Sequence, residues 1–379
     1  MSFTGKATFT AGATLPEIAE DIADLVAINS PHETPLLDAL GDPARFARST
    51  VHEWLEDSLL PNSDSVASSA SPLIEVSHID RFRVGDLVRL GTSEEVMLVT
   101  NVDTGLSKIT VTRGYGGTPT VALVDTDPLH IIGNAALEGG DAAAARFVAR
   151  SRRTNYTQIL SATVEVSGSE LAVRQIGLRD ELDYQKNQRL RELLRDLESS
   201  VINGVSPAAN PQGTSTVRRS MRGIISFIQS NHFIPDEDDF PAQTTLSEEQ
   251  LNLALRRIWD SSAGQIDLIV CGGATKRAIN GFVASNRRFG ADTESFKSLV
   301  NVYESDFGVC RVVLSRYVPA DTVLLLDSSR IDVMPLSGRS FHYKPLATTG
   351  DRESGLVIGE YTLEMRNENA HGIITGLAA

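Results

Sequence analysis

The chain has 379 residues, of which 41% are apolar and 22% charged, a composition typical of a folded protein of two or three domains. Its formal net charge of −14 argues against a whole-molecule attraction to nucleic acid or to an anionic membrane. The sequence shows neither the apolar core of a secretory signal nor an apolar run long enough to span a membrane. Cys271 and Cys310 each lie in an apolar run and are predicted to be buried free thiols.

The first fifty residues are predicted to combine an arm with one short helix. Residues 1–14 are small and polar and are expected to form an extended or mobile arm. Pro16 begins the helix, and Asn29-Ser30-Pro31 ends it. The apolar side chains of the helix share one face: Ile18, Ile22, Leu25 and Val26. Residues 32–57 mix short apolar patches with turn formers, so this segment is expected to pack along another part of the protein.

A compact β block is predicted at 81–133. Ser58–Pro72, rich in Ser and Ala, is interpreted as the linker before it. Four or five short apolar runs within the block are separated by Gly, Asp and Asn turns, and Asp103-Thr104-Gly105 is typical of a hairpin. The block therefore predicts a small barrel or sandwich inserted as a module, which the chain leaves through residues 138–145.

The longest helix signal runs over Leu178–Gly204. Its apolar side chains recur at helical spacing on one face: Leu190, Leu193, Leu194, Leu197 and Val201. Asp180 and Asp183 suit the positive end of the helix dipole, and Gly204 is predicted to end the helix. Tyr184–Arg189 has no aliphatic side chain, so only the leucine half is expected to pack on a sheet. The polar half is expected to lie on a surface or against a neighbouring molecule.

The region from Leu246 onwards predicts a compact α/β domain. Ser247 and Gln250 form a capping box at the start of a helix. The buried face of that helix is predicted to consist of Leu251, Leu255, Ile258 and Trp259. A second helix is predicted at 274–283, and apolar strands at 265–271, 308–315, 321–327 and 331–334. The tail, 356–377, is predicted to be a strand pair.

Four motifs look like chemical sites, and each lacks an essential part. His52–Glu56 has Glu56 where a zinc helix needs its second His. The glycines of Arg113–Gly117 are followed by a strand-like run, so they predict a turn with positive φ. Cys271–Lys276 passes from a strand through glycines into a helix but lacks phosphate-loop spacing, and Asp236–Asp239 lacks the pattern of a calcium loop. No metal or cofactor is predicted.

The strongest local charge is an arginine cluster between 146 and 153. It is either a solvated strand face or a fork for carboxylates of a neighbouring subunit, and the acidic net charge favours subunit contact over nucleic acid. The residues proposed for an assembly interface are Trp54, Arg146, Arg150, Arg152, Arg153, Lys186 and Arg189. Within the His52–Glu56 motif, Trp54 is interpreted as a packing anchor in preference to a metal site.

Short motifs keep a fixed order over nearly the whole chain: Glu33–Leu37, His52–Leu59, Arg113–Thr118, Asn155–Ile159, Val166–Gly168, Glu192–Glu198 with Asn203-Gly204, Met221–Ile224, Tyr361–Glu364 and Asn369–Gly372. In that order they resemble the Hong Kong 97-type major capsid proteins of tailed bacteriophages. Within that group they are similar to the branch of major head proteins with a β module inserted in the extended-loop region.

The resemblance implies an α+β fold of the Hong Kong 97 type with a small inserted all-β, barrel-like module. The parts that it implies are an N-terminal arm with a short helix (1–50), an extended loop (51–167) that contains the β module (81–133), a peripheral domain (168–234 and 340–379) with a spine helix (178–204), and an axial domain (235–339).

The implied function is that of a structural subunit without catalysis or cofactor. It self-assembles as hexamers and pentamers into an icosahedral shell that encloses double-stranded DNA without sequence-specific binding. Expected partners are other copies, a portal protein and scaffold or decoration proteins, with assembly in the host cytoplasm and a final location in the virion capsid. Some members cross-link a Lys of the extended loop to a neighbour's Asn, but Lys108, the only Lys in 51–167, lies in the β module, so no cross-link is expected.

Two alternatives remain open at this point. A tail or decoration protein would bind its target through the β block at 81–133 and would be a monomer or trimer. An α/β enzyme would hold a nucleotide or phosphate around Cys271–Lys276, with Lys276 contributing to ligand binding.

Overall fold

The computed structural model describes residues 33–43, 45–70, 73–91, 93–140, 145–172, 180–286, 302–347 and 350–378. The chain divides into two compact units, Met1–Trp54 with Arg153–Ala379, and Leu55–Arg152. The arm at 1–14 and the short helix that begins at Pro16 lie outside the described residues. No described helix combines the length and the apolar character that crossing a membrane requires.

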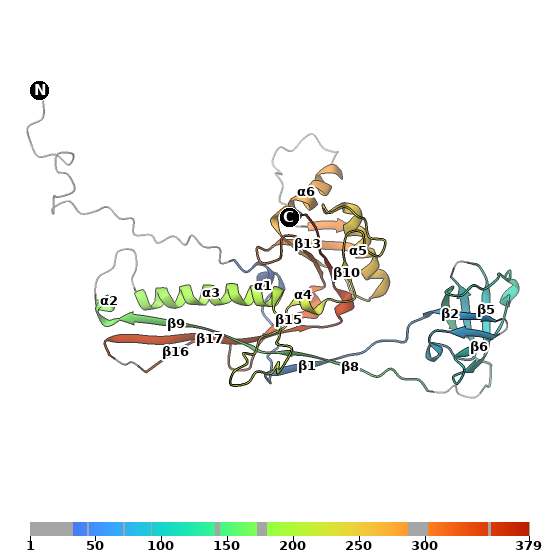
Figure 1. The fold of residues 1–379 in the computed structure, drawn as a ribbon, viewed down its shortest axis with the longest axis horizontal. Coiled ribbons are helices and arrows are strands. Elements are labelled where there is room, and N and C mark those ends of the chain that lie inside the picture. Colours follow the sequence, from blue (N-terminus) through green and yellow to red (C-terminus); the bar gives the residue numbers. More distant parts are fainter. Residues whose placement is uncertain are drawn as a thin grey trace, which may run out of the picture. The chain divides into compact units, whose positions relative to one another are not determined.

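The first unit contains a sheet built around one long strand, β17 (Arg352–Met365). Along one edge, β9 (Gln158–Ser167) pairs antiparallel with residues 352–361. Along the other edge, β16 (His342–Pro345) and β15 (Ile331–Pro335) pair antiparallel with successive parts of β17. Figure 1 shows β17 and β9 running side by side for most of their length.

Helix α3 (Glu181–Asn203) lies along β9 (Figure 1). Its buried side chains share a core with β9: Leu193, Leu197, Val201 and Ile202 from the helix, and Leu160 and Val164 from the strand. The prediction that the leucine half packs on a sheet is therefore confirmed. Leu194, which the helical pattern placed on the same face, is only half-buried.

The two ends of α3 are fixed in different ways. At the start, the Asp180 side chain accepts a hydrogen bond from the Asp183 N–H at 3.1 Å, a normal N-cap. At the end, Gly204 has φ −57°, so it does not stop the helix through the left-handed conformation that the sequence suggested. A Cβ on Gly204 would lie 2.7 Å from the Met221 carbonyl oxygen, so close approach of two backbones requires glycine here.

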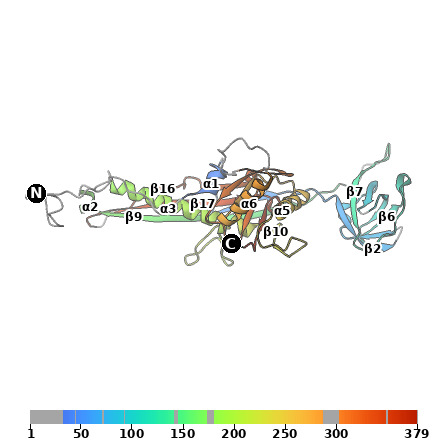
Figure 2. The same cartoon turned by 90° about the horizontal axis from the view of Figure 1, so that it is seen from above.

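A second sheet has six strands in the order β10-β18-β14-β11-β13-β12. The strands are β10 (His232–Phe233), β11 (Leu268–Cys271), β12 (Val302–Ser305), β13 (Gly308–Leu314), β14 (Val323–Leu326) and β18 (Gly372–Ile374). Ile269 and Cys271 pack in a core with helices α5 (Glu248–Ser261) and α6 (Gly273–Asn286), whereas Leu268 and Val270 join the core of α3. The predicted α/β region is thus confirmed, and Figure 2 shows α5 and α6 beside this sheet.

Shorter elements connect these layers: α1 (Pro35–Leu40), α2 (Gly168–Ala172), α4 (Ile224–Phe227), and the 3₁₀ turns η5 (Ser328–Arg330) and η6 (Glu368–Ala370). Strands β1 (Val51–Glu56) and β8 (Ser151–Tyr156) pair with each other where the chain leaves and rejoins the first unit. The capping box of α5 is present, with Ser247 Oγ accepting from the Gln250 N–H at 3.2 Å.

The second unit is a closed barrel in the strand order β2-β3-β6-β5-β4-β7. The strands are β2 (Ser63–Ala70), β3 (Leu73–Val76), β4 (Asp86–Leu90), β5 (Val96–Asp103), β6 (Lys108–Thr112) and β7 (Pro128–Asn134), with 3₁₀ turns η3 (Ile79–Arg81) and η4 (Tyr115–Gly117). Alternate side chains fill the interior, such as Met97 and Val99 of β5 and Ile109 and Val111 of β6. Gly114, Gly116 and Gly117 have positive φ, as predicted for a turn.

Three predicted bounds are wrong because strand pairing is decided across the sheet and not along the sequence. Ser58–Pro72 is not simply a linker, since it contains β2, and the barrel begins well before residue 81. The tail is not a strand pair, because β17 and β18 belong to different sheets. Likewise, β18 joins the sheet of the region 235–339, while β15, inside that region, pairs with β17.

We predict that Leu197→Ala lowers the free energy of unfolding by about 2–5 kcal/mol, because it leaves a cavity between α3 and β9. Leu194→Ala is the matched control, since the same atoms are removed from a half-buried position on the same helix. Urea unfolding followed by circular dichroism measures both. Equal losses for the two variants would contradict the assigned helix face.

Candidate assembly interface

Two buried glutamates of β17 hold distant segments of the first unit together. Glu364 accepts hydrogen bonds from Arg45 Nη2 at 2.9 Å and from His52 Nε2 at 2.6 Å. Burial alone would raise the pKa of Glu364, but the hydrogen bonds from His52 and Arg45 lower it. The ionised carboxylate therefore fixes the segment around Arg45 and the start of β1 on the long sheet.

Glu360 lies four residues before Glu364 on the same face of β17, and its carboxylate is likewise surrounded by hydrogen-bond donors and cations. Its Oε1 accepts from Thr157 Oγ1 at 2.6 Å and from Arg219 Nη2 at 2.5 Å, and its Oε2 lies 2.7 Å from Arg339 Nε. A buried charge without such partners would be strongly destabilising. The positions of the loops that carry Arg219 and Arg339 therefore depend on this carboxylate.

A third buried carboxylate, Glu198 of α3, holds the beginning of α1. Its two oxygens accept the Leu36 and Leu37 N–H groups, each at 2.9 Å. Burial raises the pKa of Glu198, and these two hydrogen bonds oppose that rise. The carboxylate thus fixes the first described turn of the chain against the leucine half of α3.

His371 is buried between β18 and η6. Its Nδ1 accepts the Asp327 N–H at 3.2 Å, and Nε2 lies 3.3 Å from the Arg366 carbonyl oxygen. An imidazole that accepts at Nδ1 and donates at Nε2 is neutral. Burial lowers the pKa of His371 to about 4, so the neutral form persists well below neutral pH.

Trp54, proposed for the interface, belongs to the interior of the subunit. The residue is 8% exposed and packs 5.9 Å from the Phe227 ring, centroid to centroid. Strand β1 alternates, so the neighbouring Leu55 points outward and is exposed. The burial of Trp54 fits a packing role within the subunit, and a role at an intersubunit surface stays a prediction.

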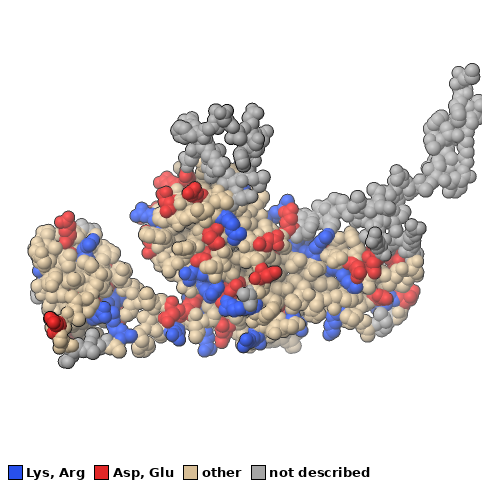
Figure 3. Space-filling view, turned by 180° about the vertical axis from the view of Figure 1, so that it is seen from behind, with Lys and Arg blue, Asp and Glu red and all other residues tan. Residues whose placement is uncertain are grey.

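The arginine cluster is spread over both units. In the second unit, Arg146 donates to the Arg81 carbonyl oxygen at 3.1 Å, and Arg150 pairs with Asp57 at 3.2 Å with both side chains exposed. Arg152 and Arg153 are exposed residues of β8. On the face shown in Figure 3, basic and acidic side chains are interspersed rather than gathered into patches of one sign.

The two candidates on α3 contact the subunit's own side chains. Lys186 Nζ lies 2.9 Å from Asp183 and 4.4 Å above the centre of the Tyr343 ring, which belongs to β16. Arg189 pairs with Glu192 at 2.6 Å. Leu182, within the polar half, also packs against the core of the first unit. The polar half of α3 is therefore partly covered by the subunit itself.

The largest unexplained apolar exposure lies in the segments that lead to and from the barrel. Leu59, Leu137 and Phe147 are 93%, 86% and 89% exposed. None of the three belongs to a hydrophobic core of the described residues. Single exposed apolar residues are ordinary, but nearly complete exposure of three large ones in the segments before and after the barrel is typical of a surface that a partner covers.

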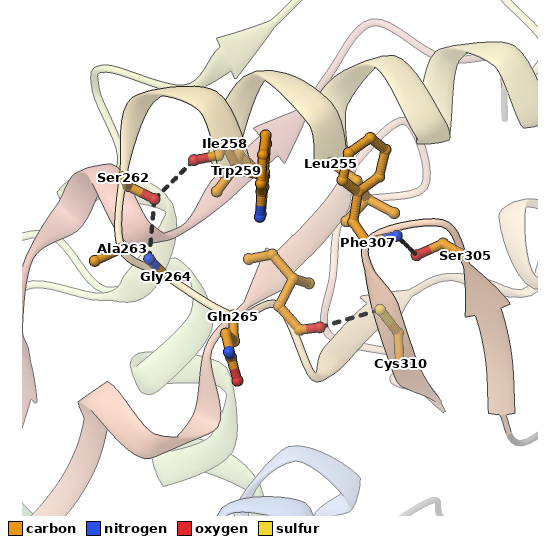
Figure 4. Close-up of a pocket in the computed structure, with 11 residues that line it drawn as sticks. Leu255, Ile258, Trp259, Ser262, Ala263, Gly264, Gln265, Ser305, Phe307 and Cys310 are labelled. Atoms are coloured by element: carbon orange, nitrogen blue, oxygen red, sulfur yellow. Dashed lines mark hydrogen bonds between the residues drawn. The ribbon is translucent and has the colours of Figure 1, made fainter. Parts of the chain in front are cut away.

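Trp259, predicted to be buried, is 61% exposed. It stands at the rim of a depression of about 250 Å³, with its ring centroid 6.0 Å from that of Phe307 (Figure 4). Cys310 lies at the floor, where its thiol donates to the Ile266 carbonyl oxygen. The helical pattern predicted a buried Trp259 because this residue lies at the edge of the apolar stripe, next to Ile258, which is buried.

The motifs that look like chemical sites have structural explanations. His52 lies on a strand and not on a helix, and the Lys276 ammonium donates to the Val312 carbonyl oxygen at 3.1 Å. The two cysteines are free and buried, as predicted. Within the described ranges, no group of three His, Cys, Asp or Glu side chains is placed to hold a metal ion.

The fold is similar to that of solved phage-particle structures. The capsid of an empty GTA particle aligns with a TM-score of 0.56 at 9% identity, covering 99% of this chain and 100% of that one. A structure from Gordonia phage Cozz aligns with a TM-score of 0.52 at 11% identity (100% and 97% covered), and one from Microbacterium phage Oxtober96 with 0.51 at 12% (94% and 96%). No curated relative matches the sequence.

This mixed α/β architecture resembles that of the GTA capsid and of the phage structures. Residues 3–378 match the family described as SU10 major capsid protein, and because the match spans nearly the whole chain, the chain belongs to that family. It is a subunit of a homo-oligomeric capsid shell, located in the virion. The alternatives of a tail protein, a decoration protein or a nucleotide-binding enzyme are not favoured.

We expect Glu198→Ala to speed hydrogen exchange at the Leu36 and Leu37 amides and to cost about 1–3 kcal/mol for each donor left buried without a partner. Glu192→Ala is the control on the same helix, because Glu192 is half-buried and pairs with Arg189 of the same helix. Mass spectrometry of exchanged peptides from residues 33–43 measures the effect. Unchanged exchange in Glu198→Ala would show that α1 does not depend on this carboxylate.

The buried His371 should make stability fall with acid. Its pKa is 6.5 when exposed and about 4 when folded, so below pH 6.5 the unfolded chain binds a proton that the folded chain refuses. The neutral His371 therefore contributes roughly 3 kcal/mol to the free energy of unfolding above pH 6.5. This contribution falls as the pH is lowered and is lost by pH 4. His371→Gln should flatten the dependence of urea midpoints between pH 6.5 and 4.5, whereas the exposed-site control His342→Gln should keep it. Equal slopes would contradict this assignment.

Proposed function

We propose that copies of this chain form hexamers and pentamers that close into an icosahedral shell of the Hong Kong 97 type around double-stranded DNA. In this proposal residues 1–50 are the arm and 51–167 the extended loop with the barrel as its inserted module. Residues 168–234 and 340–379 are the peripheral domain, and 235–339 the axial domain. The exchange of β15 and β18 between the two sheets ties the last two domains together.

The observation that carries the proposal is the exposure of Leu59, Leu137 and Phe147. These residues lie in connecting segments that have no core of their own, so burying them requires another molecule. In a homo-oligomeric shell the nearest available surface is that of a second copy. A contact between unlike patches of identical subunits is heterologous, and such contacts close into rings.

Arginine side chains are proposed to add polar contacts to the same interface. Arg150 and Asp57 form an exposed pair at 3.2 Å, which a neighbouring carboxylate can replace at little cost. Arg146, Arg152 and Arg153 extend this surface along the chain. Lys186 and Arg189 of α3 are proposed for a separate contact, with their present partners Asp183 and Glu192 as competitors.

Trp259 is proposed as a second intersubunit contact, in the axial domain. Tryptophan is enriched among the residues that dominate binding energy, and here it combines exposure with a depression beside it.

The net charge of −14 suits a shell whose inner surface does not hold packed DNA strongly. Portal, scaffold and decoration proteins are the further partners proposed, with assembly in the host cytoplasm. Lys108 pairs with Glu75 on the outer surface of the barrel at 3.8 Å, and we propose a shell without covalent cross-links.

Negative-stain microscopy of the overexpressed protein tests the proposal, with capsomers, tubes or closed shells expected. Phe147→Asp should abolish these particles and leave the melting temperature of the subunit unchanged, because the side chain contacts no core of the subunit. Val124→Asp, an equally polar change at an exposed position of the barrel, is the matched control and should assemble. Strict monomers of the unaltered protein at high concentration, or shells from Phe147→Asp, would contradict the proposal.

A further inference from the structure

A second depression lies beside α5, and residues of β10, of the acidic loop and of α5 line it. Its cavity volume is about 330 Å³. Phe233 and Phe240 belong to the core of the subunit, where their rings stack with centroids 5.5 Å apart. Arg257 Nη2 donates to the Asp238 carbonyl oxygen at 2.6 Å and so ties the acidic loop to the helix. This Phe233–Phe240 depression is therefore already formed in the single subunit.

The lining of the Phe233–Phe240 depression combines apolar surface with hydrogen-bond acceptors. Phe233, Phe240 and the partly buried Ile234 supply the apolar part, and Glu237 and Asp260 are exposed acidic residues of the lining. An occupant that fits needs a flat apolar body with a hydrogen-bond donor at its edge. The tryptophan side chain has this chemistry, because indole is apolar apart from one N–H group, which only donates. The volume lies at the lower end of the roughly 300–1,000 Å³ of ligand pockets, which suits one side chain.

The exposed Trp259 lies on the other side of the same helix. Arg257 and Ser261, which line the Phe233–Phe240 depression, are each two residues from Trp259 in the sequence. A helix turns 100° per residue, so both point about 200° away from Trp259. Trp259 instead stands beside Phe307 and is 61% exposed (Figure 4). The helix therefore separates Trp259 from its own subunit's depression, and only the depression of another copy is open to it.

We propose that Trp259 of one copy inserts into the Phe233–Phe240 depression of the next copy, where the indole N–H donates to a carboxylate of the lining. This inference rests on the proposed assembly of the shell and names one contact within it. A copy that gives its Trp259 to one neighbour still offers its own depression to another. The contact is therefore heterologous, and it can repeat around a ring until the ring closes.

Two substitutions test the contact from its two sides. Trp259→Ala removes the inserted ring, and Ser261→Tyr places a ring at the exposed edge of the depression. Each should raise the protein concentration at which particles form by about tenfold or more, measured by light scattering and negative-stain microscopy. Because both changes remove the same contact, the double variant should show no further loss. Glu249→Tyr is the matched control, because it adds the same ring at an exposed position of α5 outside both depressions, and it should assemble normally.

Fluorescence detects the inserted ring directly. The other tryptophan, Trp54, is only 8% exposed, so quenching by acrylamide reports mainly on Trp259 and should fall several-fold when particles form. A nitroxide on Glu237→Cys, in copies that also carry Trp259→Phe, should quench the Trp259 fluorescence of unlabelled copies assembled with them. The native thiols are buried and do not take the label. A nitroxide on Glu249→Cys is the control, because position 249 lies about 18 Å along α5 from Ser261, and it should quench little.

Three results would overturn this contact: additive losses in the double variant, particles in which Trp259 stays open to acrylamide, or equal quenching from the two labelled positions. Normal particles from Trp259→Ala would also overturn it, while leaving the proposed shell assembly intact. The absence of particles from the unaltered protein would instead overturn both proposals. Melting temperatures of the single subunits accompany each variant, and they should stay unchanged because Trp259, Ser261 and Glu249 are exposed.

Discussion

Burial of carboxylates in the first unit is the constraint on which the rest of the structure depends. Glu360 and Glu364 stand on β17, the central strand, and a charge in that position is tolerable only when cations and donors surround it. Those partners, among them Arg45 and Arg219, come from segments far apart in the chain. The long sheet is therefore more than a ladder of backbone hydrogen bonds, because its side chains also fix the segments that lead into the extended connections.

This way of fixing segments suits a shell subunit. The connecting segments around Leu59 and Phe147 have no core of their own, so their stability within one subunit is limited to the ion pairs and the short β1–β8 ladder at their base. In the proposed shell, anchoring at the base with apolar exposure beyond it leaves most of the binding energy of these segments for another subunit. The barrel, with a closed interior core, offers no open strand edge to unintended partners.

The sequence predicted local features well and long-range pairing poorly. The spacing of the leucines predicted α3, and the Ser247–Gln250 capping box predicted the start of α5. Both signals depend only on residues that are close together in the sequence. The position of β18 beside β14 was beyond such reasoning, because it depends on partners about fifty residues away. Ser63–Ala70 has the composition of a linker because Ser and Ala hide the alternation of Asp64 and Val66, which face inward.

The candidate site residues show the same difference between features set by neighbouring residues and features set by distant partners. The role of Glu198 was invisible in the sequence, where it completes a surface charge ladder, because its partners are backbone N–H groups 161 and 162 residues away. Trp259 and Ile258 adjoin in the chain, yet one is exposed and the other buried, since a helix turns 100° per residue and the stripe ends between them. Apolar residues therefore reveal the subunit's own core through their period, whereas those that we propose to contact another subunit, such as Phe147, are recognised only by their exposure after folding.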